Sequence, residues 1–177
     1  MNNKNMTIEL LTKKQMELAG RLGLSGEYEG ALSVLDRLIE VYPKYIGAIL
    51  YKGNLLDLWG LSGAVEEMES EKLFETARAC YEQALEMDLD CIPAYIDLGD
   101  YWERKGEHEN AIKSLNTAIK MLEDGKCWVS REEEIDDAFS RKASILRGLG
   151  REDEAVFCLA TGRRLNPSSM LLEKEEK

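Results

Sequence analysis

The sequence predicts an all-α protein built from helical hairpins, and three observations support this fold class. Turn glycines and small residues recur at related intervals, apolar residues fall at helical spacing between them, and only three prolines occur in 177 residues. The stretch "AYIDLGDYWERKGEHENAIKSLNTAI", residues 94–119, shows the pattern most clearly. Gly106 divides it into two predicted helices, and the acidic residues that follow suit the positive end of the second helix dipole.

A related turn sequence occurs three times, as "GEYEGA" from Gly26, "GEHENA" from Gly106 and "GREDEA" from Gly150. We expect Gly60 to be a fourth turn glycine, before a longer connection that ends at Ala77. These four glycines are separated by 34, 46 and 44 residues. The intervals fit a unit of 34 residues that carries two insertions, of roughly 12 and 10 residues.

Small residues occupy matching places in both helices of each predicted unit. In the order of the units, they are Ala19, Gly53, Gly99 and Ala143 in the first helices, and Ala31, Ala77, Ala111 and Ala155 in the second helices. Two antiparallel helices approach closely only where their crossing point carries little side-chain bulk. We therefore expect Gly99 and Ala111 to form such a crossing, with larger residues interlocking around it.

The third unit resembles the tetratricopeptide repeat (TPR) family, whose units are helix–turn–helix pairs of 34 residues. The residues that carry the resemblance are Tyr95, Leu98, Gly99 and Trp102, followed by Ala111, Leu115 and Ala118. The resemblance implies a right-handed α–α superhelix of stacked TPR hairpins. We expect a single domain, 1–177, with repeats at about 12–45, 46–91, 92–125 and 136–167, insertions near 61–76 and at 126–135, and a short tail at 168–177.

Capping residues in the two insertions predict where helices begin. The first should lengthen helices rather than form a loop, with Ser62 or Ser70 capping the second helix of that unit. Ser130 followed by Glu133 matches a capping box, so the last unit's first helix should begin near Arg131.

In TPR arrays the first helix of each unit lines a concave groove, which implies a set of partner-binding residues here. They are Leu50, Tyr51, Asn54 and Asp57; Ile96, Asp97, Asp100, Glu103 and Arg104; and Ser140, Arg141, Ser144 and Arg147. The set begins apolar, becomes acidic and ends basic. Either an extended peptide or partner helix binds through these charges, or the charges pair with one another across adjacent units.

One TPR subgroup clamps the C-terminal carboxylate of heat-shock chaperones with two Lys, two Asn and one Arg. Counted from the second unit, only Asn54 and Arg141 match, while Leu50, Asp97 and Asp137 stand at the other places. We therefore expect no tight binding of that tail.

The resemblance implies a non-enzymatic scaffold or adaptor that binds a protein or peptide partner in the groove. The alternative is a self-associating structural or regulatory subunit that uses the convex face or the insertions. There Leu61, Trp128 and Val129 either form a docking surface or cover the ends of the repeat core.

Catalysis, metals and cofactors find little support in the sequence. The single histidine, His108, is expected in a turn without a positioned nucleophile, and the four cysteines form no CxxC pair. We predict no enzyme activity, no metal and no cofactor.

The chain carries a net charge of -11, which disfavours phosphate backbones and anionic lipid. We therefore expect neither nucleic acid nor a membrane as partner. The acidic surface either keeps the protein in solution or steers a basic ligand towards it. We also expect a cytoplasmic protein that is a monomer or a weak homodimer.

Overall fold

The structure is a computed structural model that describes residues 3–170 of the chain. Within this range the chain forms eight α-helices and no strand, which confirms the all-α prediction. The helices group into two compact units, unit 1 (Met1–Met87) and unit 2 (Asp88–Lys177). Unit 1 contains α1 (Asn3–Leu24), α2 (Tyr28–Val41), α3 (Ile46–Leu61) and α4 (Glu67–Met87). Unit 2 contains α5 (Ile92–Arg104), α6 (His108–Glu123), α7 (Arg131–Gly148) and α8 (Glu152–Leu165).

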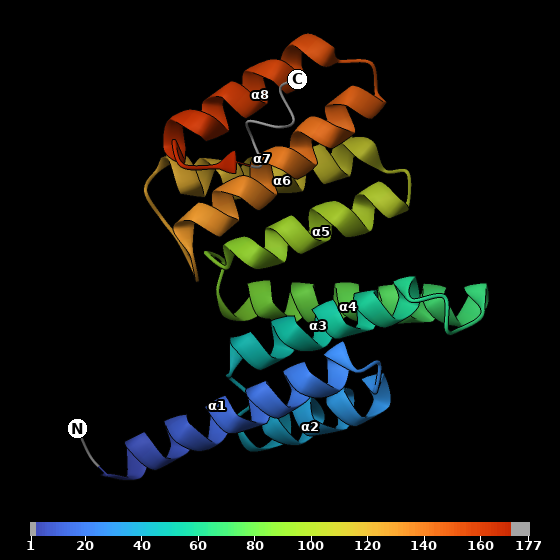
Figure 1. Cartoon of the computed structure of the whole chain (residues 1–177), viewed down its shortest axis with the longest axis vertical. Coiled ribbons are helices and arrows are strands. Elements are labelled where there is room, and N and C mark those ends of the chain that lie inside the picture. The colour runs from blue at the N-terminus through green and yellow to red at the C-terminus, as the bar shows by residue number, and fades with distance from the viewer. Residues whose placement is uncertain (1–2, 171–177) are drawn as a thin grey trace. The chain divides into compact units, whose positions relative to one another are not determined.

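Each unit consists of two helical hairpins, and the two helices of every hairpin pack along each other (Figure 1). In unit 1 the hairpins meet through α2 and α3, and in unit 2 they meet through α6 and α7. The first helices of unit 2, α5 and α7, also contact one another. The predicted single domain, the repeat bounds and the tail at 168–177 remain predictions, and most of that tail lies outside the described residues.

The turns between the helices of three hairpins confirm the glycine assignments. Gly26, Gly106 and Gly150 have φ of 80°, 72° and 73°, a left-handed conformation that favours glycine. The fourth assignment is wrong, because Gly60 lies buried inside α3. A Cβ on Gly60 would come within 2.5 Å of the Phe74 ring, so the missing side chain makes room for an aromatic residue of α4. The backbone instead turns at Gly63, where φ is 71°.

The first insertion is absorbed by helix, as expected, and α4 runs for 21 residues. Neither predicted serine caps the start of α4. Ser62 follows α3, and its Oγ donates to the Trp59 carbonyl at 2.6 Å. Ser70 lies within α4, and its Oγ donates to the Gly60 carbonyl at 3.0 Å, which joins the two helices of the hairpin.

The start of α7 agrees with the sequence prediction. Ser130 is its N-cap, and the Ser130 side chain accepts from the Glu133 amide at 3.5 Å. This bond pairs one of the amides that the first helical turn leaves without an internal partner.

All eight small residues that recur in phase are buried. The structure places Leu115 at the crossing, because the atoms nearest to a Cβ on Gly99 would be those of Leu115. A Cβ on Gly99 would lie 2.8 Å from Leu115 Cγ, and one on Gly53 would lie 2.5 Å from Tyr81 Cε1. Leu115 follows Ala111 by one helical turn, and helical side chains project along the axis onto the neighbouring turn. Gly53 and Gly99 of the first helices therefore each accommodate a large residue of the second helix, Tyr81 and Leu115 respectively.

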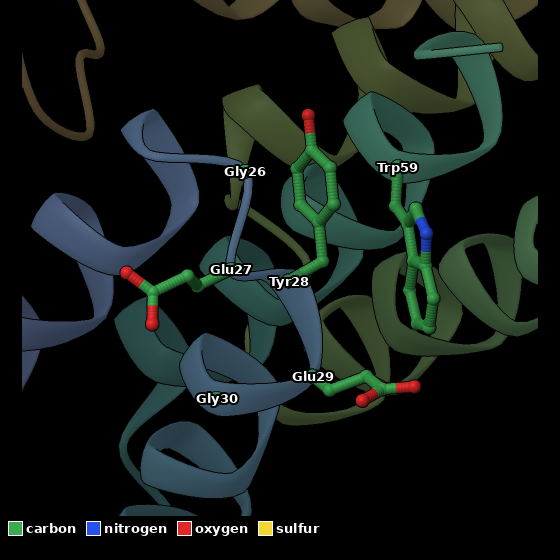
Figure 2. Close-up of a pocket in the computed structure, with 6 residues that line it drawn as sticks. All are labelled: Gly26, Glu27, Tyr28, Glu29, Gly30 and Trp59. Carbon is green, nitrogen blue, oxygen red and sulfur yellow. The ribbon is translucent and has the colours of Figure 1, made fainter. Parts of the chain in front are cut away.

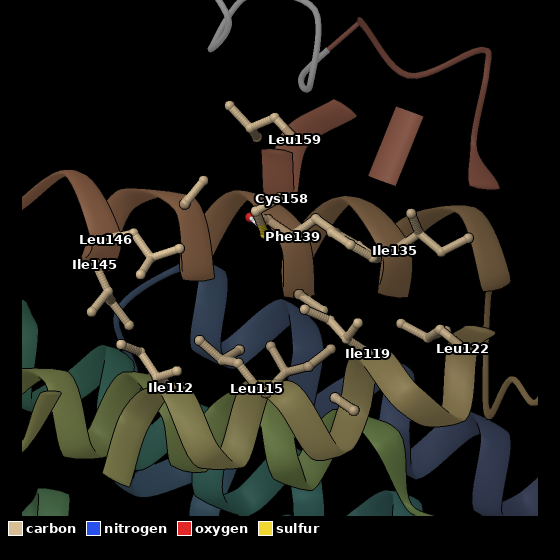
Figure 3. Packing of buried hydrophobic residues seen from close by; sticks show 14 of the residues in the cluster. Ile112, Leu115, Ile119, Leu122, Ile135, Phe139, Ile145, Leu146, Cys158 and Leu159 are labelled. Atoms are coloured by element: carbon tan, nitrogen blue, oxygen red, sulfur yellow. Dashed lines mark hydrogen bonds between the residues drawn. The ribbon is translucent and has the colours of Figure 1, made fainter. Parts of the chain in front are cut away.

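The residues at that second-helix position are Leu35, Tyr81, Leu115 and Leu159, and each is at most 1% exposed. In unit 2 they belong to a continuous apolar core. Figure 3 shows the α6 side chains Ile112, Leu115 and Ile119 facing those of α7 and α8. Burial of a leucine of this kind contributes roughly 1.5–3 kcal/mol.

None of the helices in residues 3–170 is long and apolar enough to cross a membrane.

Candidate functional site

The first helices of unit 2 place charged side chains on one common surface. Asp100 of α5 and Arg141 of α7 form an ion pair between their side chains, which are 23% and 34% exposed. Asp97 precedes Asp100 by one turn of α5, and Asp137 precedes Arg141 by one turn of α7. We call these four residues the α5–α7 face.

Asp137 is a member of this face that the sequence analysis noted only as a departure from the chaperone clamp. The residue is exposed, yet burial by nearby protein raises the pKa of its carboxyl group, and the charges of Asp136 and Glu133 raise it further. The position of Asp137 one helical turn before Arg141 was the signal that could have identified it.

Several predicted binding charges already have partners within their own unit. Arg141 pairs with Asp100, and Arg147 Nε lies 3.2 Å from Glu152 Oε1 at the start of α8. In unit 1 Asp57 accepts a hydrogen bond from the Tyr81 hydroxyl at 2.9 Å. Internal pairing is therefore what the structure shows for these groups.

Three of the predicted binding residues offer little side-chain surface. Leu50 is 6% exposed, Ile96 is 3% exposed and Ser140 is 9% exposed, so these side chains pack inside the protein rather than on a binding surface. The Ser140 hydroxyl is used locally, because it donates to the Asp136 carbonyl at 2.6 Å.

The other predicted residues are more accessible. Asn54, Arg104 and Ser144 are exposed, and Tyr51 and Glu103 are half-buried. Burial also raises the pKa of the Tyr51 hydroxyl. The predicted partner-binding residues divide between unit 1, where they lie on α3, and unit 2, where they lie on α5 and α7.

The second insertion forms a hydrogen-bonded loop in unit 2. Glu134, only 5% exposed, accepts the backbone N–H groups of Trp128 and Val129 with its carboxylate, at 3.0 and 2.7 Å. The Trp128 indole packs against the unit 2 core, and its Nε1 donates to Asp88 at 2.9 Å. Trp128 therefore covers core, whereas Val129 and Leu61 are 72% and 62% exposed.

The cysteines have the chemistry of packing residues rather than nucleophiles. All four are unpaired, and only Cys127 is exposed. Burial raises the pKa of Cys91 and of Cys158 to about 11, which disfavours the reactive thiolate at neutral pH.

The remaining candidates for metal or acid–base chemistry are also sparse. Among the described residues, no group of three or more His, Cys, Asp or Glu side chains could hold a metal ion. His108 is half-buried and begins α6, so its predicted place in the turn is wrong.

The comparisons with known proteins address the family directly. Residues 92–122, which span α5 and nearly all of α6, match the family model described as tetratricopeptide repeat. The fold of this chain is that of the TPR proteins. Within residues 3–170, the eight helices form four hairpins that fit about four TPR repeats, and this helical fold resembles that of TPR proteins.

A solved structure with a similar fold is TTC0263, a thermophilic TPR protein of Thermus thermophilus. It is 17% identical, covers 93% of this chain and 96% of its own, and has a TM-score of 0.66. MamA is 16% identical with coverages of 88% and 92% and a TM-score of 0.44. YrrB, a TPR protein with an unusual peptide-binding site, is 17% identical with coverages of 92% and 90% and a TM-score of 0.44. No protein of curated function matches the sequence.

TPR proteins generally bind protein or peptide partners, and they are generally interaction modules rather than enzymes.

Proposed function

We propose that this TPR protein is a non-enzymatic scaffold that binds a protein or peptide partner on the α5–α7 face. The ion pair between Asp100 and Arg141 is the observation that carries the proposal. It joins the first helices of neighbouring hairpins, so their polar side chains share one surface on which an extended segment can lie.

The charges of this face favour a basic segment of the partner. Asp97, Asp100 and Asp137 contribute three carboxylates, and Arg141 contributes one guanidinium. A lysine or arginine of the partner would form charge-assisted hydrogen bonds here, and it would relieve the crowding of negative charge around Asp137. The net charge of -11 would also steer a basic partner towards the protein.

The test begins with affinity purification of a partner on the wild-type full chain, identified by mass spectrometry. Isothermal titration of that partner is then repeated with Asp97→Lys and with Asp137→Lys. Each variant should weaken binding at least tenfold, because a lysine reverses the local charge. Glu40→Lys, on the exposed side of α2 in unit 1, is the matched control. If all three variants bind the partner as the wild type does, the assignment of the face is wrong.

Self-association is a second candidate function, favoured by the exposed apolar residues of the insertions. Leu61 and Val129 project from different insertions, and neither covers core. Analytical ultracentrifugation tests this candidate, because self-association through these residues predicts a dimer whose population falls in Leu61→Ser and Val129→Ser. A protein that stays monomeric at tens of micromolar would contradict self-association.

A further inference from the structure

A second surface of interest lies in unit 1, where the end of α3 meets the start of α2. Tyr28 is the first residue of α2, and Trp59 lies in the last turn of α3. Their rings are nearly parallel, with an interplanar angle of 13° and centroids 5.9 Å apart. Figure 2 shows the two rings side by side above the first turn of α2.

The rings border an open cavity of about 310 Å³. Its lining consists of Gly26, Glu27, Tyr28, Glu29, Gly30 and Trp59. Two of these residues are glycines, so they contribute no side chain to fill the space. Directly stacked rings would lie roughly 3.5 Å apart, so rings whose centroids are 5.9 Å apart leave part of their faces uncovered.

The charge of this cavity is negative. Glu27 and Glu29 are exposed, and they are the only ionisable lining residues besides the Tyr28 hydroxyl. Glu27 Oε1 accepts a hydrogen bond from Ser25 Oγ at 2.9 Å, and no described lysine or arginine forms an ion pair with either carboxylate. In Figure 2 the Glu29 side chain extends to the side of Trp59, and the Glu27 side chain extends the opposite way.

The positive end of the α2 dipole also lies here, and it opposes the binding of a cation. Its effect equals about half a unit charge, which one carboxylate outweighs. Half-buried aromatic rings beside an unpaired carboxylate favour a flat cation, since the ring faces carry negative potential. Among the cationic side chains of proteins, the guanidinium of arginine is planar, stacks on aromatic rings and donates to a carboxylate through two N–H groups.

We propose that Trp59, Tyr28 and Glu29 bind an arginine side chain of a peptide partner. The guanidinium stacks on the uncovered part of the Trp59 face, and the Glu29 carboxylate accepts its N–H groups. Tyr28 holds the indole in place from the other ring. This site belongs to unit 1 and is independent of the α5–α7 face, so either can fail without the other.

The test uses the ¹⁵N-labelled full chain and three short peptides, acetyl-Gly-X-Gly-amide with X as arginine, lysine or citrulline. The Trp59 indole N–H resonance, assigned with Trp59→Phe, is followed during each titration. Arginine should give a saturable shift with a dissociation constant in the millimolar range. Lysine should bind at least fivefold more weakly, because it cannot stack, and citrulline should not bind because it has no charge.

Two variants distinguish binding by the Glu29 carboxylate from attraction by the net negative charge of the chain. Glu29→Gln should weaken the arginine peptide at least fivefold. Glu40→Gln, which removes the same charge from the exposed side of the same helix, should leave its affinity unchanged. The proposal is overturned if arginine does not move the Trp59 resonance, if lysine or citrulline binds as well, or if the two variants behave alike.

Discussion

The two insertions of this chain differ in structure although each adds a similar length to a repeat. The first is absorbed into helices, so that α3 continues to Leu61 and α4 begins at Glu67. The second is divided: an irregular loop follows Gly125, where φ is 84°, and ends at Ser130, and residues 131–135 belong to α7. The difference shows that the length of an insertion does not decide the structure it takes.

Local sequence explains this difference. The first insertion contains "EEMESEKLF", which is rich in strong helix formers. A contact between the helices, the Phe74 ring against Gly60, then secures the added turns. The second insertion begins with "KCWVS" directly after Gly125, and this glycine, the valine and the serine disfavour helix.

The insertions are therefore stabilised by different forces. In the first, the helices are joined by the packing of Phe74 against Gly60 and by the Ser70–Gly60 hydrogen bond, and neither contact titrates. The second depends on carboxylates, because Glu134 holds the backbone of the loop and Asp88 holds the Trp128 indole. Packing variants should affect the first most strongly, and charge or pH should affect the second.

The largest expected effect comes from filling the space at Gly60. In Gly60→Val the new Cβ would lie within 2.5 Å of the Phe74 ring, so either the ring or α4 must shift. We expect a loss of about 3 kcal/mol in the free energy of unfolding, measured by urea denaturation followed by circular dichroism.

Gly148→Ala is the control for this substitution. Gly148 is also helical, but a Cβ there would meet nothing within 4 Å. Alanine should therefore leave stability unchanged or raise it by up to about 1 kcal/mol. A Gly60→Val protein as stable as the wild type would show that Phe74 does not pack at this point.

A smaller loss is expected from Glu134→Ala in the second insertion. The substitution leaves the amides of Trp128 and Val129 without their acceptor in a partly buried setting. We expect a loss of about 2 kcal/mol in the same urea experiment. Glu132→Ala, at an exposed position of the same helical turn, should change stability by no more than about 0.5 kcal/mol. Equal losses in the two variants would contradict the role given to Glu134.

The smallest expected effect is the pH response of Asp88. The hydrogen bond donated by Trp128 lowers the pKa of the Asp88 carboxyl group, with help from the Asp90 amide. The ionised form is thus the one the folded loop prefers. Its stabilisation is present above the ordinary pKa of 3.8 and is lost as the pH falls through the lowered value.

The Trp128 indole N–H resonance should accordingly shift with a midpoint below pH 3.8. Asp88→Asn should abolish this titration. The Ala64 amide of the first insertion, whose acceptor is the Ser62 hydroxyl, should move far less over the same range. A midpoint above 3.8 would contradict the cause assigned to the shift.

Much of the fold could be predicted because helical periodicity and turn chemistry are local properties. Gly26, Gly106 and Gly150 lie at turns because a left-handed backbone favours glycine. The role of Gly60 could not be predicted, because a glycine can also allow close packing, and sequence spacing alone does not separate this role from a turn.

Side-chain pairing could not be predicted in the same way. The sequence predicts that Asp100 and Arg141 lie on one surface. Whether their side chains pair with each other or bind a ligand depends on their rotamers, which the sequence does not give. Asp137 was missed as a site residue because the raised pKa of its carboxyl group depends first on burial in the folded chain, which sequence spacing does not show. The Tyr28–Trp59 pair was missed because the two residues come from different hairpins.

The central claim is that the first-helix glycines Gly53 and Gly99 each make room for a large residue of the partner helix. A double-mutant cycle of Gly99→Ala and Leu115→Ala tests this most directly, by urea unfolding of the full chain. Gly99→Ala should destabilise the wild type by about 1 kcal/mol, because its Cβ would lie 2.8 Å from Leu115 Cγ. In the Leu115→Ala background it should be neutral or stabilising, since the helix then gains alanine without a clash. The same cost in both backgrounds, within about 0.5 kcal/mol, would contradict the claim.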